Sequence, residues 1–126
     1  MNNQKQANIN VTIKDFFFKW VNLTKPFHKL AKQKQDVLSL LLYYHYMYRK
    51  EITNKKILWK MIFDYDTKKL IKEELNLKDQ GLQNVLSILR KEGVIKDNKI
   101  INLFIPKIDS DSNNFKIIFN FTIVDG

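Results

Sequence analysis

The chain has 126 residues, a formal net charge of +9, 44% hydrophobic residues and no cysteine. This length is typical of one globular domain, and the hydrophobic content excludes a disordered or collagen-like chain. Without cysteine there are no disulfides, thiolate metal sites or cysteine nucleophiles. The longest apolar run, residues 37–44, is interrupted by Ser39 and is far shorter than the roughly 20 residues that span a bilayer, so we expect no membrane association. Residues 1–10 lack the apolar stretch of a signal peptide, which indicates a protein that is not secreted.

The positive charge is concentrated in the first part of the chain. Residues 1–50 carry nine Lys and Arg against two acidic residues, whereas residues 95–126 carry four of each. A basic patch is predicted around the start of the first long helix, made of Lys25, Lys29, Lys32 and Lys34. It is either a solvated surface or a binding surface for an anionic partner, which would be double-stranded DNA or an acidic protein surface.

The first half of the chain predicts an arm followed by helices. Residues 8–13 alternate polar and apolar side chains, which predicts a short strand or an extended arm. Apolar residues at helical spacing predict a short helix from residue 14, stopped by Pro26, and a central helix at 33–48. Another helix is predicted from Thr53, as its cap, to Phe63, with a buried face of Ile57, Leu58, Met61 and Ile62.

A helix-turn-helix pattern follows. Asp66 or Thr67 can cap a helix that ends at Leu75, residues 76–78 form a turn, and Asp79 can cap a second helix that runs to Glu92. The second helix has an apolar stripe of Leu82, Val85, Leu86 and Leu89. Its opposite face is polar and holds Gln80, Gln83, Asn84, Ser87 and Lys91.

The C-terminal part predicts β-structure. Gly93 suits the left-handed position that ends a helix, and residues 94–95 begin an extended segment. Residues 99–105 and 115–123 are apolar-rich runs that predict a hairpin, joined by a loop at 106–114. The tip of that loop, residues 108–114, contains Asp109 and Asp111 and no cation.

The order of helices, helix-turn-helix and hairpin, with the stretches LIKEELNLK (70–78) and LRKEGVI (89–95), resembles the winged-helix family. The resemblance covers about residues 33–123. It implies a mainly α fold with a C-terminal β-hairpin (α+β), in which residues 1–24 form an N-terminal arm with a short aromatic helix and residues 25–126 form one winged-helix-like domain. In that family the second helix enters the major groove of DNA. The positions that match its recognition face are Gln80, Gln83, Asn84, Ser87, Arg90 and Lys91.

The Lys-, Asn- and Ile-rich composition and the run WKMIFDYD (59–66) are similar to small proteins of crAss-like and other AT-rich tailed bacteriophages. This similarity implies a location in the virion or the host cytoplasm. The acidic loop tip departs from the winged-helix pattern, because phosphate would repel it. That departure weighs against ordinary DNA binding.

The residues with catalytic or metal-binding chemistry are few. His28 is isolated, and His45 lies in an apolar, tyrosine-rich helix, which favours a half-buried structural role. Asp64 and Asp66 precede a predicted helix and are expected to cap it rather than to bind a cation. We therefore predict no enzymatic activity, no metal, no cofactor and no small-molecule substrate.

The aromatic residues near the N-terminus are denser than one stripe of a short helix can bury. They are Phe16, Phe17, Phe18 and Trp20. They form either the core with a dimer seam or a docking surface for a partner.

Two hypotheses follow. The first is a non-enzymatic structural or assembly subunit of a tailed phage, such as a head-tail connector or ring component, which binds other protein subunits as a homo- or hetero-oligomer. The alternative is a winged-helix DNA-binding protein, either a transcription regulator or a replication accessory. A basic patch on the same side as Gln83 and Ser87 would favour DNA binding.

Overall fold

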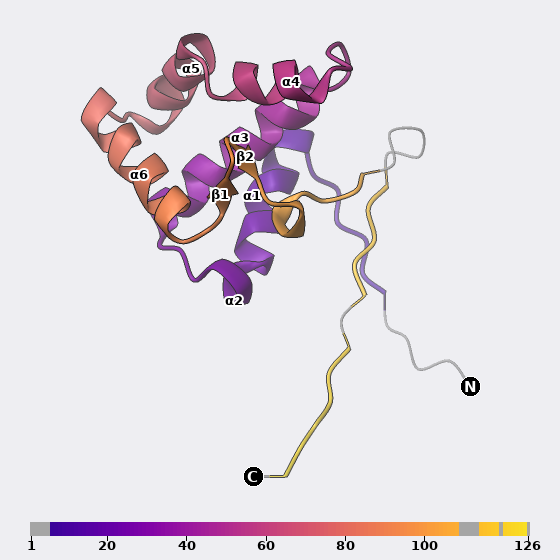
Figure 1. Ribbon diagram of the computed structural model, residues 1–126. Coiled ribbons are helices and arrows are strands. Elements are labelled where there is room, and N and C mark those ends of the chain that lie inside the picture. The colour runs from indigo at the N-terminus through magenta and orange to yellow at the C-terminus, as the bar shows by residue number, and fades with distance from the viewer. Residues whose placement is uncertain (1–5, 109–113, 119, 126) are drawn as a thin grey trace.

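The computed structural model describes residues 6–108, 114–118 and 120–125. This part of the chain is mainly helical, with a small two-stranded antiparallel sheet after the last helix (Figure 1). The elements are α1 (Ile13–Leu23), α2 (Lys25–His28), α3 (Lys32–Tyr48), α4 (Lys55–Ile62), α5 (Tyr65–Leu75), α6 (Asp79–Lys91), β1 (Ile95–Lys96), β2 (Lys99–Ile100) and the 3₁₀-helix η1 (Asn102–Phe104). None of these helices has both the length and the apolar composition needed to cross a membrane.

Helix α3 is the centre of the fold, as its apolar circumference predicts. It packs against α1, α4, α5 and α6, and it buries five apolar side chains almost completely: Val37, Leu38, Leu40, Leu41 and Leu42. Ser39 is buried among them, and its hydroxyl donates a hydrogen bond to the Gln35 carbonyl at 2.7 Å. The polar group in the run is therefore satisfied within the helix.

Helix α1 covers one side of α3. Its N-cap is Thr12, whose hydroxyl accepts a hydrogen bond from the Asp15 N–H at 3.2 Å. Phe17 and Val21 are its buried residues. The helix ends at Leu23 as expected, and Pro26 lies in the first turn of α2, where no backbone N–H is required. Residues 6–12 form no strand, so the extended-arm prediction fits this segment and the strand prediction does not.

His28, expected to be isolated, is buried and ties α1 to the start of α3. Its Nε2 donates to the Val21 carbonyl at 2.8 Å, because Nδ1 accepts from the Leu30 N–H at 2.9 Å. These two bonds fix the neutral tautomer with the proton on Nε2. His28 thus satisfies two backbone groups in the core and has a structural role.

The caps of α4 and α5 test two sequence predictions. Asn54, rather than the predicted Thr53, caps α4 through a bond from the Ile57 N–H at 3.1 Å. Asp64, one of the two carboxylates expected to cap α5, does so through a bond from the Thr67 N–H at 2.9 Å, whereas Asp66 and Thr67, the other candidates, lie within the helix. In both helices the cap is the side chain three positions before the free N–H.

The buried face of α4 is narrower than predicted. Leu58 and Ile62, four residues apart, are buried, whereas Met61 is half-buried and Ile57 is 52% exposed. Ile57 lies about 100° around the helix from Leu58. It therefore turns away from the contact of α4 with the rest of the fold.

Helix α6 follows its predicted pattern closely. Leu82, Val85, Leu86 and Leu89 are all buried. Asp79 is the first helical residue rather than the cap, and the N-cap position, Lys78, makes no side-chain bond. Gly93 ends the helix with φ +79, a conformation that glycine adopts without strain.

The hairpin lies earlier in the chain than predicted. Strands β1 and β2 pair Ile95 with Ile100 and Lys96 with Lys99, and the two-residue turn is Asp97-Asn98. Both turn residues have positive φ, 54° and 58°, as a type I′ turn requires, and Asp and Asn tolerate that conformation. Residues 114–118 and 120–125 contain no strand, so the hairpin between 99–105 and 115–123 is wrong for these residues. Most of the predicted acidic tip, residues 109–113, lies outside the described part of the chain.

Candidate binding surfaces

Helix α6 presents an exposed polar face. The six residues predicted for the recognition face are all exposed: Gln80, Gln83, Asn84, Ser87, Arg90 and Lys91. Their exposure follows from the burial of the apolar stripe on the other side of the helix. The Gln80 side-chain amide donates to the Asn84 side-chain oxygen at 2.8 Å, so these two groups are oriented relative to each other. Amides of this kind are able to read adenine edges in a major groove.

The hairpin packs against α6 and adds two cations near it. Lys96 and Lys99 are exposed and flank the Asp97-Asn98 turn. A turn with two lysines and one carboxylate has a net positive charge. The net charge of the observed hairpin turn is therefore opposite in sign to that of the acidic loop that the sequence suggested as the wing tip.

A hollow of about 340 Å³ lies between α5 and α6. Its lining residues come from both helices and are Tyr65, Lys68, Lys72, Asp79, Leu82 and Gln83. Lys72 forms an ion pair with Asp79, and the Lys72 Nζ is 5.8 Å from the centroid of the Tyr65 ring. Only Gln83 among these residues was a predicted site residue. The sequence signal for the others is the spacing of Tyr65, Lys68 and Lys72, which places them on one face of a helix.

The predicted basic patch spans three elements. Lys25 belongs to α2, Lys29 is its C-cap, and Lys32 and Lys34 belong to the first turn of α3. All but Lys34 are exposed. Lys32 makes an ion pair with Asp36 at 2.6 Å, which reduces the charge available to a partner.

The N-terminal aromatic residues pack on the chain's own core. Phe17 is buried, whereas Phe16, Phe18 and Trp20 are half-buried. The Phe115 ring of the C-terminal segment lies edge-on to Phe16 at 5.0 Å and to Trp20 at 5.5 Å, and the Trp20 indole N–H donates to a backbone carbonyl at 2.8 Å. The predicted docking surface is therefore partly covered by the chain itself.

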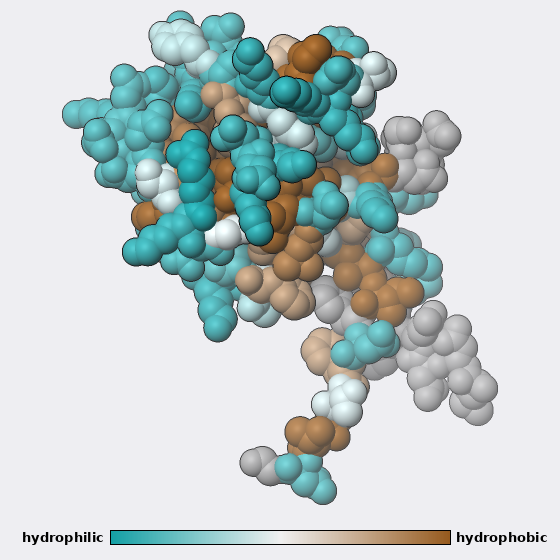
Figure 2. All heavy atoms as spheres, viewed as in Figure 1, coloured by the Kyte–Doolittle hydropathy of each residue, from teal (hydrophilic) through white to brown (hydrophobic). Residues whose placement is uncertain are grey.

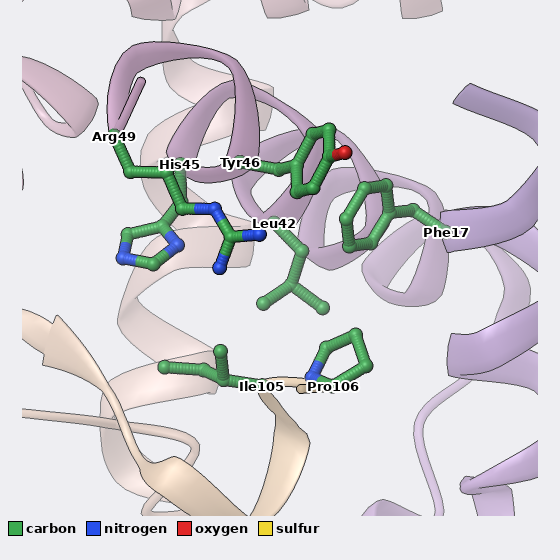
Figure 3. A pocket seen from close by; sticks show the side chains of 7 residues that line it. All are labelled: Phe17, Leu42, His45, Tyr46, Arg49, Ile105 and Pro106. Atoms are coloured by element: carbon green, nitrogen blue, oxygen red, sulfur yellow. The ribbon is translucent and has the colours of Figure 1, made fainter. Parts of the chain in front are cut away.

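A small cavity lies where the C-terminal segment crosses the end of α3 (Figure 3). His45 and Arg49 enter it from α3, and Ile105 and Pro106 approach from the opposite side. Its volume of about 10 Å³ is enough for about one water molecule and too small for a substrate.

The environment of His45 keeps it neutral. Its ring stacks on Trp59 at 4.4 Å. Burial, and secondly the charge of Arg49, lowers the pKa of His45 from 6.5 to about 4. Arg49 also donates to the Ile108 carbonyl at 3.3 Å, which ties the C-terminal segment to α3. This cluster matches the structural role expected for His45. Within the described ranges, no group of three or more His, Asp or Glu side chains is placed to hold a metal ion.

The terminal segments expose apolar side chains. Ile118, Ile123 and Val124 are 68%, 96% and 78% exposed, and Ile9 in the N-terminal segment is 72% exposed. Residues 120–125 extend away from the helical body (Figure 1), and hydrophobic residues are visible at the bottom of Figure 2. Exposed apolar surface that is contiguous along a segment is typical of protein–protein contact sites.

No protein-family model matches the chain, and comparisons with curated proteins and with solved structures found no match.

Proposed function

We propose that this protein is a non-enzymatic assembly subunit that binds other protein subunits through its C-terminal segment, as a connector or ring component of a tailed bacteriophage would. The observation that carries the proposal is the exposure of Ile118, Ile123 and Val124 on an extended segment. An extended segment with apolar side chains is suited to add to a neighbour's sheet or to fill a neighbour's groove. The phage context rests on the sequence resemblance.

The start of this segment is held against the helical body, so the rest of the segment leaves the body from a fixed position. Phe115 packs between Phe16 and Trp20, and Arg49 holds the Ile108 carbonyl. Beyond the Phe115 contact, the apolar side chains of Ile118, Ile123 and Val124 are exposed, and residues 120–125 lead away from the helices (Figure 1). Burial of apolar surface contributes about 25 cal/mol per Å², so several such side chains supply useful binding energy.

Sedimentation velocity of the purified full chain over a range of concentrations tests the proposal. A ring subunit is expected to form oligomers that a double Ile123→Asp, Val124→Asp variant cannot form. Asn120→Asp with Thr122→Asp is the matched control, because it places the same charges at neighbouring exposed positions. A wild-type chain that stays monomeric throughout would contradict self-assembly into a ring, and a double variant that assembles like the wild type would contradict the role of the C-terminal segment.

A second candidate function is duplex DNA binding through α6 and the hairpin. The position of the hairpin favours it, because its turn is flanked by Lys96 and Lys99 and the face of α6 beside it is exposed. The argument that an acidic wing tip would be repelled by phosphate therefore does not apply to the observed hairpin. The chain's net charge of +9 supports the same interpretation.

Fluorescence anisotropy with a labelled random duplex at several salt concentrations tests this second function. DNA binding predicts an affinity that falls steeply with log salt. Charge reversal of Lys96 and Lys99, the cations that flank the hairpin turn, should weaken binding strongly, and the same change at the exposed α4 lysines Lys55 and Lys56 is the control. Gln83→Ala with Asn84→Ala should relax sequence preference by about 1 to 3 kcal/mol per lost base contact. Binding that none of these variants changes would exclude this interface.

A further inference from the structure

The hollow between α5 and α6 has the chemistry of a ligand site. Its volume of about 340 Å³ lies at the lower end of the range of about 300 to 1,000 Å³ for small-ligand pockets. The hollow is open to solvent, and one of the two helices that line it, α6, also carries the exposed polar face. None of the functions argued above uses its α5 side.

The α5 side of the hollow combines an aromatic ring with two ammonium groups. Tyr65, Lys68 and Lys72 recur at spacings of three and four residues, which places them on one face of the helix. Tyr65 is 71% exposed, although a tyrosine ring gains free energy when its face is covered. An exposed aromatic residue beside two lysines is typical of surfaces that bind nucleic-acid strands.

The α6 side supplies an apolar floor and two polar groups. Leu82 lines the hollow together with Asp79 and Gln83, and it is 1% exposed. Asp79 pairs with Lys72, so in the free protein this lysine is held by a carboxylate at the rim. No ion pair of the described residues involves Lys68. Lys68 can therefore bind a phosphate directly, and Lys72 can bind one when the phosphate displaces Asp79 from the ion pair.

We propose that this hollow binds one nucleotide unit of a single-stranded nucleic acid. The base stacks on the Tyr65 ring above Leu82, its edge meets the Gln83 amide, and the phosphates lie against Lys68 and Lys72. A single strand fits better than a duplex, because neighbouring pairs cover both faces of a base in a duplex and leave none for Tyr65. This site is independent of assembly through the C-terminal segment.

Anisotropy of a labelled oligo(dT) with the full chain tests the site. Tyr65→Ala should weaken binding about 10-fold or more, as expected for the loss of one base–aromatic stack, and Tyr65→Phe should keep it. Lys68→Ala should weaken binding several-fold, whereas Lys69→Ala, the same charge change at the next residue and outside the hollow, should have little effect. Asp79→Asn should tighten binding, because it frees Lys72 and removes a negative charge. A purely structural role for Asp79 would not predict this gain.

Several results would overturn the proposal. Equal losses for Lys68→Ala and Lys69→Ala would show general attraction to a basic surface. Unchanged binding in Tyr65→Ala, or the same loss for a duplex as for oligo(dT), would exclude stacking of an unpaired base. Thermal unfolding of each variant checks that it is folded. The sedimentation behaviour of Tyr65→Ala should match the wild type, so failure of this site and failure of assembly can be told apart.

Discussion

Leu86→Ala tests the packing of α6, on which the exposed polar face and the hollow between α5 and α6 depend. Leu86 is 1% exposed and lies in the stripe that faces the core. Truncation to alanine removes three carbon atoms, each of which contributes about 0.8 kcal/mol when buried, or about 2.4 kcal/mol in total. The unfilled cavity adds up to about 2 kcal/mol, depending on how far neighbours collapse into it. We expect a loss of about 3 to 4 kcal/mol in the free energy of unfolding.

Urea unfolding followed by far-UV circular dichroism measures this loss, and the melting temperature should fall by about 10 °C or more. Gln83→Ala is the matched control on the same helix, since its side chain is exposed and should change stability by no more than about 0.5 kcal/mol. If the two variants cost the same, the faces of α6 are assigned wrongly. The hollow and the exposed polar face of α6 would then be assigned to the wrong side of the helix.

Three other perturbations follow from single contacts. The pKa of His45 is lowered to about 4 in the folded chain, so the unfolded chain binds more protons between about pH 6.5 and 4. The free energy of unfolding, and with it the melting temperature, should therefore decrease as the pH is lowered from about 6.5 to 4. The melting temperature of His45→Phe, which keeps a ring on Trp59, should decrease less over the same pH range. Trp20→Phe leaves the Phe104 carbonyl without its 2.8 Å indole donor and should cost about 1 to 2 kcal/mol in denaturant unfolding; no loss would mean that water replaces the donor. Gly93→Ala should cost about 1 kcal/mol from backbone strain alone, because an added Cβ has no atom within 4 Å; a much larger loss would indicate a steric clash instead.

Amphipathic periodicity was sufficient to locate the longer helices, although it gave no sign of the four-residue α2. The spacing of Leu82, Val85, Leu86 and Leu89 predicted a buried stripe, and all four are at most 2% exposed. The same signal located α1 and α3 to within a residue or two. Periodicity succeeds here because a helix that packs on one side requires it, whatever partner covers that side.

Caps and the hairpin needed information that the sequence does not hold locally. Asp64 competes with Asp66 as a cap, and the choice depends on Thr67, which is buried and donates to the Met61 carbonyl at 2.8 Å. The hairpin was missed because Asp97-Asn98 lacks the glycine that marks most type I′ turns. The apolar-rich residues 99–105 predicted one strand, but only Lys99 and Ile100 pair in the sheet. Ile100 and Phe104 are buried in the core, and Phe104 is the last residue of the 3₁₀-helix η1.

The hollow could not be predicted from either helix alone. Tyr65 and Lys68 lie on α5, whereas Asp79 and Gln83 lie on α6, and only the packing of the two helices brings them together. The ion pair of Lys72 with Asp79 spans the turn between the helices. A sequence shows which residues share a face of one helix, but it does not show which faces of two helices border the same space.

The corrected hairpin changes how the charge of the chain relates to function. The acidic loop tip was one reason to expect no ordinary DNA binding. The observed hairpin turn is flanked by Lys96 and Lys99, and most of the acidic tip, residues 109–113, lies outside the described part of the chain. The exposed apolar residues of the C-terminal segment lie on a different part of the chain from α5 and α6. Assembly through the C-terminal segment and nucleic-acid contact through α5 and α6 would use different residues, so the two interfaces are compatible. Variants at Ile123 and at Tyr65 should therefore affect assembly and strand binding separately, and a variant at either residue that abolished both would show that they form one surface.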